Sequence, residues 1–195
     1  DILMANPPFA GDIKESRLIS KYDLGKRADG KTQSKIGRDI LFIERNLNFL
    51  GPGGRMAVIL PQGRFNNTSD KYIRDYIAKR CRILAVVGLH GNVFKPHTGT
   101  KTSVLFLQKW DDEKCPFRED YPIFFATMRE PSKDSSGDKI YCTNDDGSFL
   151  LDANDHLIVK HDLFNHEGRT QDGIAEAFME FAKKENLSFF QTARP

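Results

Sequence analysis

Apolar and polar positions along the first 110 residues follow the pattern of an α/β protein. Four apolar runs are typical of strands, and two stretches between the first three runs carry apolar residues at helical spacing. The strands are expected at 2–5, 55–60, 82–89 and 102–109, and the helices at 36–50 and 66–77. Because runs that are apolar throughout belong to strands covered on both faces, the pattern predicts a parallel, doubly wound sheet with Rossmann-like crossovers.

The ends of these elements carry their own signals. The first helix is expected to keep Glu44, Arg45 and Asn48 on its polar side and to end at Gly51-Pro-Gly-Gly54. Residues 66–70 supply candidate caps for the second helix. The last two strands have no helix between them, so we expect an antiparallel hairpin at the edge of the sheet.

The character of the chain changes after residue 110. A strand is expected at 121–128, a short β ribbon at 135–151, and an amphipathic helix at 174–185 that is capped by Asp172. No internal repeat is evident. The sequence therefore predicts two parts, residues 1–110 as half of an α/β sheet and residues 111–195 as an α+β extension.

Composition limits the classes of protein that need to be considered. A hydrophobic fraction of 39% and a charged fraction of 29% fit a globular protein. No apolar run approaches the ~20 residues that span a bilayer, so no membrane partner is expected. The three scattered cysteines form no CxxC pair, which indicates a reduced, cytoplasmic setting and no metal site. The chain begins inside a strand, which suggests a fragment of a longer protein.

Charge is distributed unevenly along the chain. Residues 1–110 hold 19 Lys and Arg against nine Asp and Glu, whereas residues 111–195 hold 10 against 18. The polar stretch 10–38 concentrates the positive charge and follows the first strand directly. Such a long loop is either functional or disordered, and a basic one can follow a phosphate backbone. Candidate DNA-binding residues in it are Lys14, Arg17, Lys21, Lys26, Arg27 and Lys31.

The most informative stretch is Asn6-Pro7-Pro8-Phe9, directly after the first strand. Proline has no N–H and a fixed φ, so the two prolines end the strand in a rigid corner. Active sites of such sheets lie at the carboxyl ends of strands, where Asn6, Gln62 and His90 all fall. The Asn6 side-chain oxygen and the Pro7 carbonyl can accept both hydrogens of an exocyclic NH2 group, and the Phe9 ring can stack on its plane. An ordinary Asn-Pro turn is the alternative.

This corner resembles the catalytic motif of S-adenosylmethionine-dependent enzymes that methylate the exocyclic nitrogen of adenine. Three further blocks make the resemblance specific: they are similar, in order, to the modification (M) subunit of type I restriction–modification systems. The blocks are Asp39–Arg45, Gly51–Pro61 and Val93–Leu107. The resemblance covers residues 1–110 well and the remainder loosely.

The resemblance implies a role for each residue of the corner. Asn6 and the Pro7 carbonyl would hold the amino group of an adenine flipped out of double-stranded DNA, next to the methyl group of S-adenosyl-L-methionine, and Phe9 would stack on the base. Asn6, Pro7, Pro8 and Phe9 are thus the expected catalytic residues, with Asn6 and Pro7 also touching the cofactor. Phe94 or Phe106 would give a second stacking wall. Specificity (S) and restriction (R) subunits are the implied protein partners.

One departure of the chain from the family pattern bears directly on activity. The glycine loop that binds the cofactor precedes the motif in this family, and Gly51-Pro-Gly-Gly54 does not replace it because it ends a helix. We therefore expect these 195 residues to be inactive alone, whereas the longer protein that contains them would be an active enzyme.

Two other functions are compatible with the sequence. One is a protein glutamine or RNA methyltransferase, because enzymes that methylate a glutamine amide use a very similar corner with Tyr in place of Phe9. The other is a degenerate, non-catalytic scaffold domain. Other candidate sites are weak: His156, His161 and His166 are spaced by five residues and share no helix face, and Asp145-Asp146-Gly147 is more typical of a hairpin turn than of a calcium loop.

Overall fold

The computed structural model describes residues 1–190, which form two compact units. The first unit comprises residues 1–86 and 103–123, and the second comprises residues 87–102 and the described residues from 124 onward. The two-part division at residue 110 stays a prediction.

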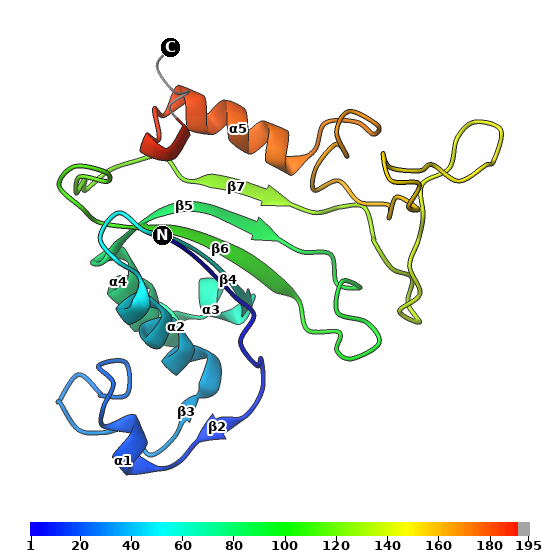
Figure 1. Cartoon of the computed structure of the whole chain (residues 1–195). Coiled ribbons are helices and arrows are strands. Elements are labelled where there is room, and N and C mark those ends of the chain that lie inside the picture. Colours follow the sequence, from blue (N-terminus) through cyan, green and yellow to red (C-terminus); the bar gives the residue numbers. More distant parts are fainter. Residues whose placement is uncertain (191–195) are drawn as a thin grey trace. The chain divides into compact units, whose positions relative to one another are not determined.

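The first unit is built on a sheet with the order β1-β4-β6-β5 (Figure 1). Its strands are β1 (Ile2–Ala5), β4 (Arg55–Pro61), β6 (Thr102–Lys109) and β5 (Cys81–Gly88). β1 and β4 are parallel, as the apolar runs predicted. β6 is antiparallel to both of its neighbours. The amide of its last residue, Lys109, donates to the carbonyl of Gly54 before β4, and the amide of the following Trp110 donates to the carbonyl of Arg80 before β5.

The predicted hairpin is therefore confirmed, but its predicted place at the sheet edge is wrong. β6 lies between β4 and β5 instead of outside β5. A hairpin brings two strands together without deciding on which side of its partner the second one pairs. The central position gives the backbone of β6 a hydrogen-bonded neighbour on each side, and an edge position would give it one.

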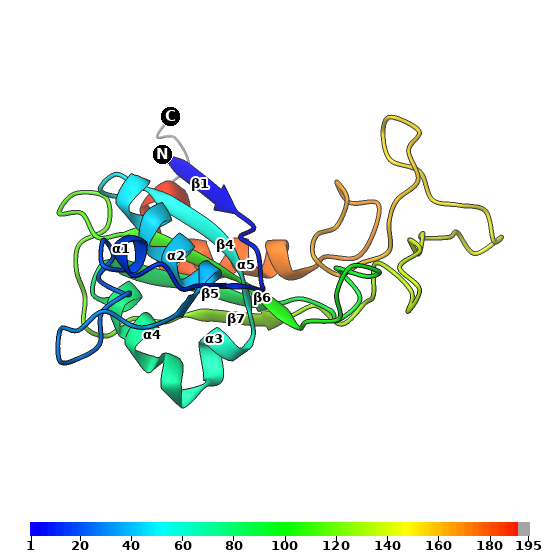
Figure 2. The same cartoon turned by 90° about the horizontal axis from the view of Figure 1, so that it is seen from below.

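Two helices cover one face of this sheet (Figures 1 and 2). They are α2 (Arg38–Phe49) and α4 (Lys71–Ala78), and the short α3 (Gly63–Asn66) and η1 (Thr68–Asp70) connect β4 to α4. Their apolar residues form one core with the strands; it includes Ile40, Ile43, Leu47, Met56, Val58, Leu60, Ile73, Ile77 and Leu107. The Lys109 ammonium closes the end of α2 by donating to the carbonyls of Leu47 (3.0 Å) and Leu50 (2.7 Å).

The strand β1 is only half covered, although its sequence predicts a buried strand. Leu3 and Ala5 pack against the core, whereas Ile2 is 67% and Met4 is 81% exposed. The difference arises because successive side chains of a strand point to opposite faces, and the helices of this unit cover one of them.

The polar stretch after β1 is ordered against α2. It contains β2 (Asp12–Ile13), paired antiparallel with β3 (Ile36–Gly37), and α1 (Ser16–Ile19). The Glu44 carboxylate, which is 4% exposed, accepts the amides of Asp23 (2.9 Å) and Leu24 (2.8 Å). The prediction that Glu44 lies on the polar side of its helix is thus wrong, because the returning chain covers it and supplies two hydrogen-bond donors.

The second unit contains β7 (Phe124–Thr127) and α5 (Ile174–Lys184), which pack through their aromatic rings. The Phe124 ring lies 5.5 Å from that of Phe178 and 5.6 Å from that of Phe181. The predicted helix is confirmed, but Asp172 does not cap it. The Glu176 carboxylate accepts the Gly173 amide at 2.8 Å, and Asp172 accepts the side-chain amide of Asn165 instead.

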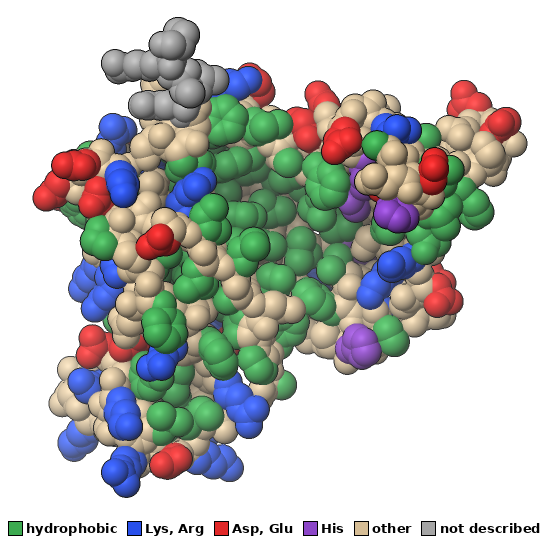
Figure 3. Space-filling model, in the orientation of Figure 1, with side chains coloured by type: hydrophobic (Ala, Val, Ile, Leu, Met, Phe, Trp, Pro, Cys, Tyr) green, Lys and Arg blue, Asp and Glu red, His purple; other side chains and the backbone are tan. Residues whose placement is uncertain are grey.

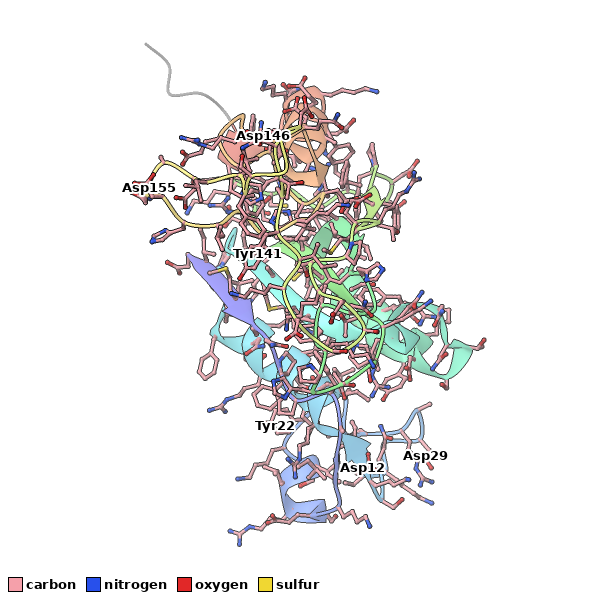
Figure 4. The ribbon with its side chains drawn as sticks, turned by 90° about the vertical axis from the view of Figure 1, so that its right-hand side faces the viewer. Asp12, Tyr22, Asp29, Tyr141, Asp146 and Asp155 are labelled. Carbon is pink, nitrogen blue, oxygen red and sulfur yellow. The ribbon has the colours of Figure 1, made fainter. Side chains whose placement is uncertain are left out.

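The predicted ribbon is a set of three similar hairpins, a repeat that the sequence did not reveal. Each closes a five-residue turn between bridged residues, at 133 and 139, 143 and 149, and 151 and 157. Figure 4 shows Asp146 and Asp155 on two of these turns. At the centre, the Leu150 amide donates to Cys142, the Ile158 amide to Leu150, and the Cys142 amide to Ile158, which closes a ring of three backbone hydrogen bonds.

None of the helices in residues 1–190 has the length and apolar character needed to cross a membrane.

Substituting Glu44→Gln is expected to loosen the stretch 10–38. The amide can still accept one of the two hydrogen bonds, but its NH2 group faces a buried donor, so we expect a loss of ~1–3 kcal/mol in unfolding free energy. Urea denaturation measures the loss, and limited trypsin digestion should cut faster at Lys21 and Lys26. The exposed Glu113→Gln is the control, and equal digestion of both variants would contradict the anchoring role.

The exposed side of β1 is expected to make the isolated chain self-associate, because an uncovered apolar strand can pair with another copy. Met4→Lys should reduce this association by placing a charge on the strand. Sedimentation velocity measures it, with Met179→Lys on α5 as the matched control. A clean monomer in the unsubstituted chain would reject the prediction.

Candidate functional site

The corner at Asn6 is formed by the abrupt end of β1. Ala5, the last residue of the strand, pairs with Val58, and β4 continues for three further residues to Pro61. Pro7 is buried and Pro8 is exposed, so one proline anchors the corner and the other lies at the surface. The Asn6 side chain is exposed, and within residues 1–190 neither its amide nor the Pro7 carbonyl has a hydrogen-bond partner. The Asn6 side chain is therefore open to a ligand, and the carbonyl of the buried Pro7 keeps its capacity to accept a hydrogen bond.

The chain beyond the corner is held in place by main-chain hydrogen bonds. Phe9 is half-buried, and Gly11 adopts a φ of +99°, which a residue with a side chain rarely does. The Gly11 carbonyl accepts the amide of Arg38, the first residue of α2, at 3.1 Å. The β2–β3 pairing continues this contact. The segment after Phe9 is thus fixed to the start of α2.

The other residues predicted at strand ends lie in different surroundings. Gln62 follows β4 and is exposed, so it shares the carboxyl edge of the first unit with Asn6. His90 and Phe94 belong to the second unit, and both are half-buried. Phe106 lies on β6 and is half-buried. A second stacking wall made by Phe94 or Phe106 stays a prediction.

The basic stretch presents its cations to solvent. All six candidate DNA-binding residues are exposed. Lys26 has a weak ion pair with Asp23 at 3.4 Å; the other five form no ion pair with the described residues. Figure 3 shows blue Lys and Arg side chains gathered over the segment that carries α1, β2 and β3 in Figure 1. In Figure 4, Asp12, Tyr22 and Asp29 mark the course of this segment.

The glycine-rich turn Gly51–Gly54 lies away from the corner. It follows the end of α2 and precedes β4, at the amino end of that strand, and Gly53 has a φ of +67°. Because the corner lies at the carboxyl end of β1, parallel to β4, this turn cannot contribute to a cofactor site there. The two residues predicted to touch the cofactor, Asn6 and Pro7, both lie at the corner.

The weaker candidates are resolved as local structure. The His161 and His166 rings lie 4.5 Å apart, and burial together with the neighbouring His166 lowers the pKa of His161. His156 lies instead beside Asp152, at 3.5 Å. The Asp146 carboxylate accepts the Ser148 amide at 2.9 Å in a hairpin turn, as the sequence predicted for this stretch.

The sheet defines a class of protein: it is part of a Rossmann-like methyltransferase fold. A putative class I S-adenosylmethionine-dependent methyltransferase from Listeria monocytogenes superposes with a TM-score of 0.54 at 19% identity, over 65% of this chain and 36% of that one. A structure of a type I restriction–modification system, solved to explain complex assembly and conformational transition, superposes with a TM-score of 0.54 at 17% identity. That match covers 100% of this chain and 37% of the other. At these identities the matches show the fold alone.

The family follows from the sequence. The model of the N-6 DNA Methylase family matches residues 1–167, and the chain belongs to this family. The type I restriction enzyme EcoEI methylase subunit of Escherichia coli is 29% identical over 123 residues, which are 63% of this chain and 24% of that protein. The E. coli type II restriction enzyme and methyltransferase RM.Eco57I is 26% identical over 148 residues, 69% of this chain and 15% of that protein.

These comparisons confirm the resemblance to type I modification subunits. The chain spans about a quarter or less of the curated relatives it matches.

Sequence reasoning missed one group of residues near the corner. The partly buried Arg64 forms an ion-pair cluster with the buried carboxylates of Asp39 and Asp70, and the residues 66–70 that were predicted to cap α4 provide no side-chain cap to it. The Asp70 carboxylate is turned to Arg64 instead. The available signal was an acid in the first turn of one predicted helix, Asp39, and another among the candidate caps of the next, Asp70, with Arg64 between them in the sequence.

Proposed function

We propose that this chain is the part of an adenine-N6 DNA methyltransferase that holds the target base, in a modification subunit of a type I restriction–modification system. The observation that carries the proposal is the Asn6 corner, at the end of a parallel strand, where an exposed side-chain amide and the Pro7 carbonyl have no hydrogen-bond partner among residues 1–190. Membership of the N-6 DNA Methylase family supports DNA methylation as the reaction. The activity of the whole enzyme is part of this proposal.

The chemistry assigned to the corner is one of orientation. The Asn6 side-chain oxygen and the Pro7 carbonyl accept the two hydrogens of the adenine amino group, and Phe9 stacks on the flipped base. S-adenosyl-L-methionine, when bound, supplies the methyl group. With both hydrogens held by acceptors, the nitrogen lone pair would face the methyl group, and one of the two held protons would be released to solvent once the nitrogen is methylated. Correct placement would thus lower the barrier without a metal or a strong base.

The proposal also names the partners of the chain, and charge decides which part of it faces DNA. The exposed cations of residues 14–31 contact the DNA backbone beside the corner, and DNA recognition is shared with a specificity subunit, with a restriction subunit as the further partner. The acidic residues 111–195 face protein instead of DNA, since like charges would repel a phosphate backbone.

The Asn6→Ala variant tests the proposed role of the corner. In the complete polypeptide that contains these residues, assayed with methyl-labelled S-adenosylmethionine, DNA and its specificity subunit, we expect N6-methyladenine formation to fall ~100-fold or more, as when a single oriented hydrogen-bonding group is removed from an active site. Asn66→Ala, an exposed asparagine of the same unit, is the control and should keep full activity.

The labelled product distinguishes the alternatives. Label in protein glutamine or in RNA would replace the adenine assignment, and no transfer to any of the three would indicate a scaffold domain.

The basic segment has a separate test. Replacing Lys21 and Arg27 together by Gln should make the negative slope of log K against log salt shallower by about two, because each lost phosphate contact removes ~0.9 from its magnitude. Fluorescence anisotropy of labelled duplex DNA at several salt concentrations measures the slope. Replacing Lys183 and Lys184 on α5 by Gln leaves it unchanged, and an equal effect of both pairs would show a general charge effect instead of a binding site.

A further inference from the structure

The ion-pair cluster around Arg64 is the best-defined polar feature of the first unit. Arg64 donates from Nε to Asp39 Oδ2 (2.6 Å) and from Nη2 to Asp39 Oδ1 (3.0 Å), while Nη1 donates to Asp70 Oδ2 (2.9 Å). Asp39 is 2% and Asp70 is 7% exposed. Burial by itself lowers the pKa of Arg64, but the hydrogen bonds and charges of Asp39 and Asp70 outweigh it and raise the pKa.

The cluster joins three elements that the sequence separates. Arg64 lies in α3, directly after β4; Asp39 is the second residue of α2; and Asp70 immediately precedes α4. A guanidinium that binds one carboxylate with two parallel hydrogen bonds fixes direction as well as distance. The fork therefore sets where α2 begins relative to the carboxyl end of β4.

The start of α2 is in turn the support of the corner. The Arg38 amide, one residue before Asp39, donates to the Gly11 carbonyl, two residues beyond Phe9. Gly37 pairs with Asp12, and a Cβ on Gly37 would lie 2.7 Å from Asp39 Oδ1 and 2.9 Å from Arg64 Nη2. The ion pair is thus packed directly against the backbone that holds the segment after the corner, and a side chain at Gly37 would push against the fork.

We propose that Arg64 is a positioning residue for the Asn6 corner: its fork on Asp39 holds the start of α2, which holds residues 9–13 and with them Phe9. This inference rests on the proposed function of the corner. In the proposed function, Arg64 contacts neither the base nor the cofactor. Its effect on the reaction passes through the Arg38–Gly11 hydrogen bond and the β2–β3 pairing.

A conservative substitution separates positioning from folding. Arg64→Lys keeps the charge beside Asp39 and Asp70 but loses the planar fork. In the complete polypeptide we expect kcat to fall ~10-fold or more, since small misplacements at a reaction centre have effects of up to ~100-fold. The KM values for DNA and S-adenosylmethionine should stay within about twofold, because the contacts that bind them are retained.

Arg74→Lys is the matched control. Arg74 donates from Nη1 to the carbonyls of Arg64 (3.1 Å) and Asn67 (2.9 Å), so this variant loses two hydrogen bonds in the same turn without touching α2. Its kcat should equal that of the unsubstituted protein. Asp70→Asn, which weakens only one bond of the cluster, is the second variant: its kcat should fall by a smaller factor than that of Arg64→Lys, and its own fall below the Arg74→Lys control still tests the proposal if Arg64→Lys does not fold.

Amide hydrogen exchange gives a readout that does not depend on activity. Arg64→Lys should speed exchange in residues 9–13 and 36–40 while β4 stays protected, and Arg74→Lys should not. Unchanged exchange, or equal kcat in the two variants, would overturn the proposal. Asn6→Ala in the activity assay distinguishes a failure of the proposed function from a failure of this inference. If Asn6→Ala keeps full activity, the proposed function is wrong, and the exchange data still decide whether Arg64 positions residues 9–13.

Discussion

The position of Asn6 depends on the parallel pairing of β1 with β4. Four residue pairs, from Ile2 with Arg55 to Ala5 with Val58, set the register of the two strands. Pro7 and Pro8 then prevent any further pairing, so β1 stops while β4 continues. The consequence is the Asn6 side-chain amide and the Pro7 carbonyl at the edge of the sheet, and in the described part of the chain neither of them has a hydrogen-bond partner. A shift of one residue in this register would turn the corner to the other face.

Two buried carboxylates support this arrangement from behind. Glu44 holds the returning basic segment by two backbone amides, and Asp39 holds Arg64. A buried charge without partners would cost several kcal/mol, so each acid is stable only when the chain around it is correctly placed. The same α2 helix therefore carries a link to the basic segment on one turn and a link to the corner on another. The site and its candidate DNA-binding surface are ordered by one element.

The charges of the chain follow the proposed division of work. The cations of residues 14–31 project from a segment that is anchored by apolar side chains and Glu44, so they are presented on an ordered surface instead of a free loop. The later part of the chain contains compact hairpins in which one aspartate of each turn accepts local backbone amides, as Asp134 does from Ser136, Gly137 and Asp138. Hydrogen bonds to those amides lower the pKa of Asp134.

Much of the fold is determined by the sequence alone. Apolar periodicity identified β4, β5, β6, α2, α4 and α5, and the two prolines identified the corner, because these signals are local and depend on few neighbours. The place of β6 between β4 and β5, the burial of Glu44, and the Arg64 cluster depended on the tertiary structure. Each of them joins segments that are distant in sequence, and a polar residue is read as exposed until its partner is known. Asn6 could be found from the chain; only the fold shows what holds it there.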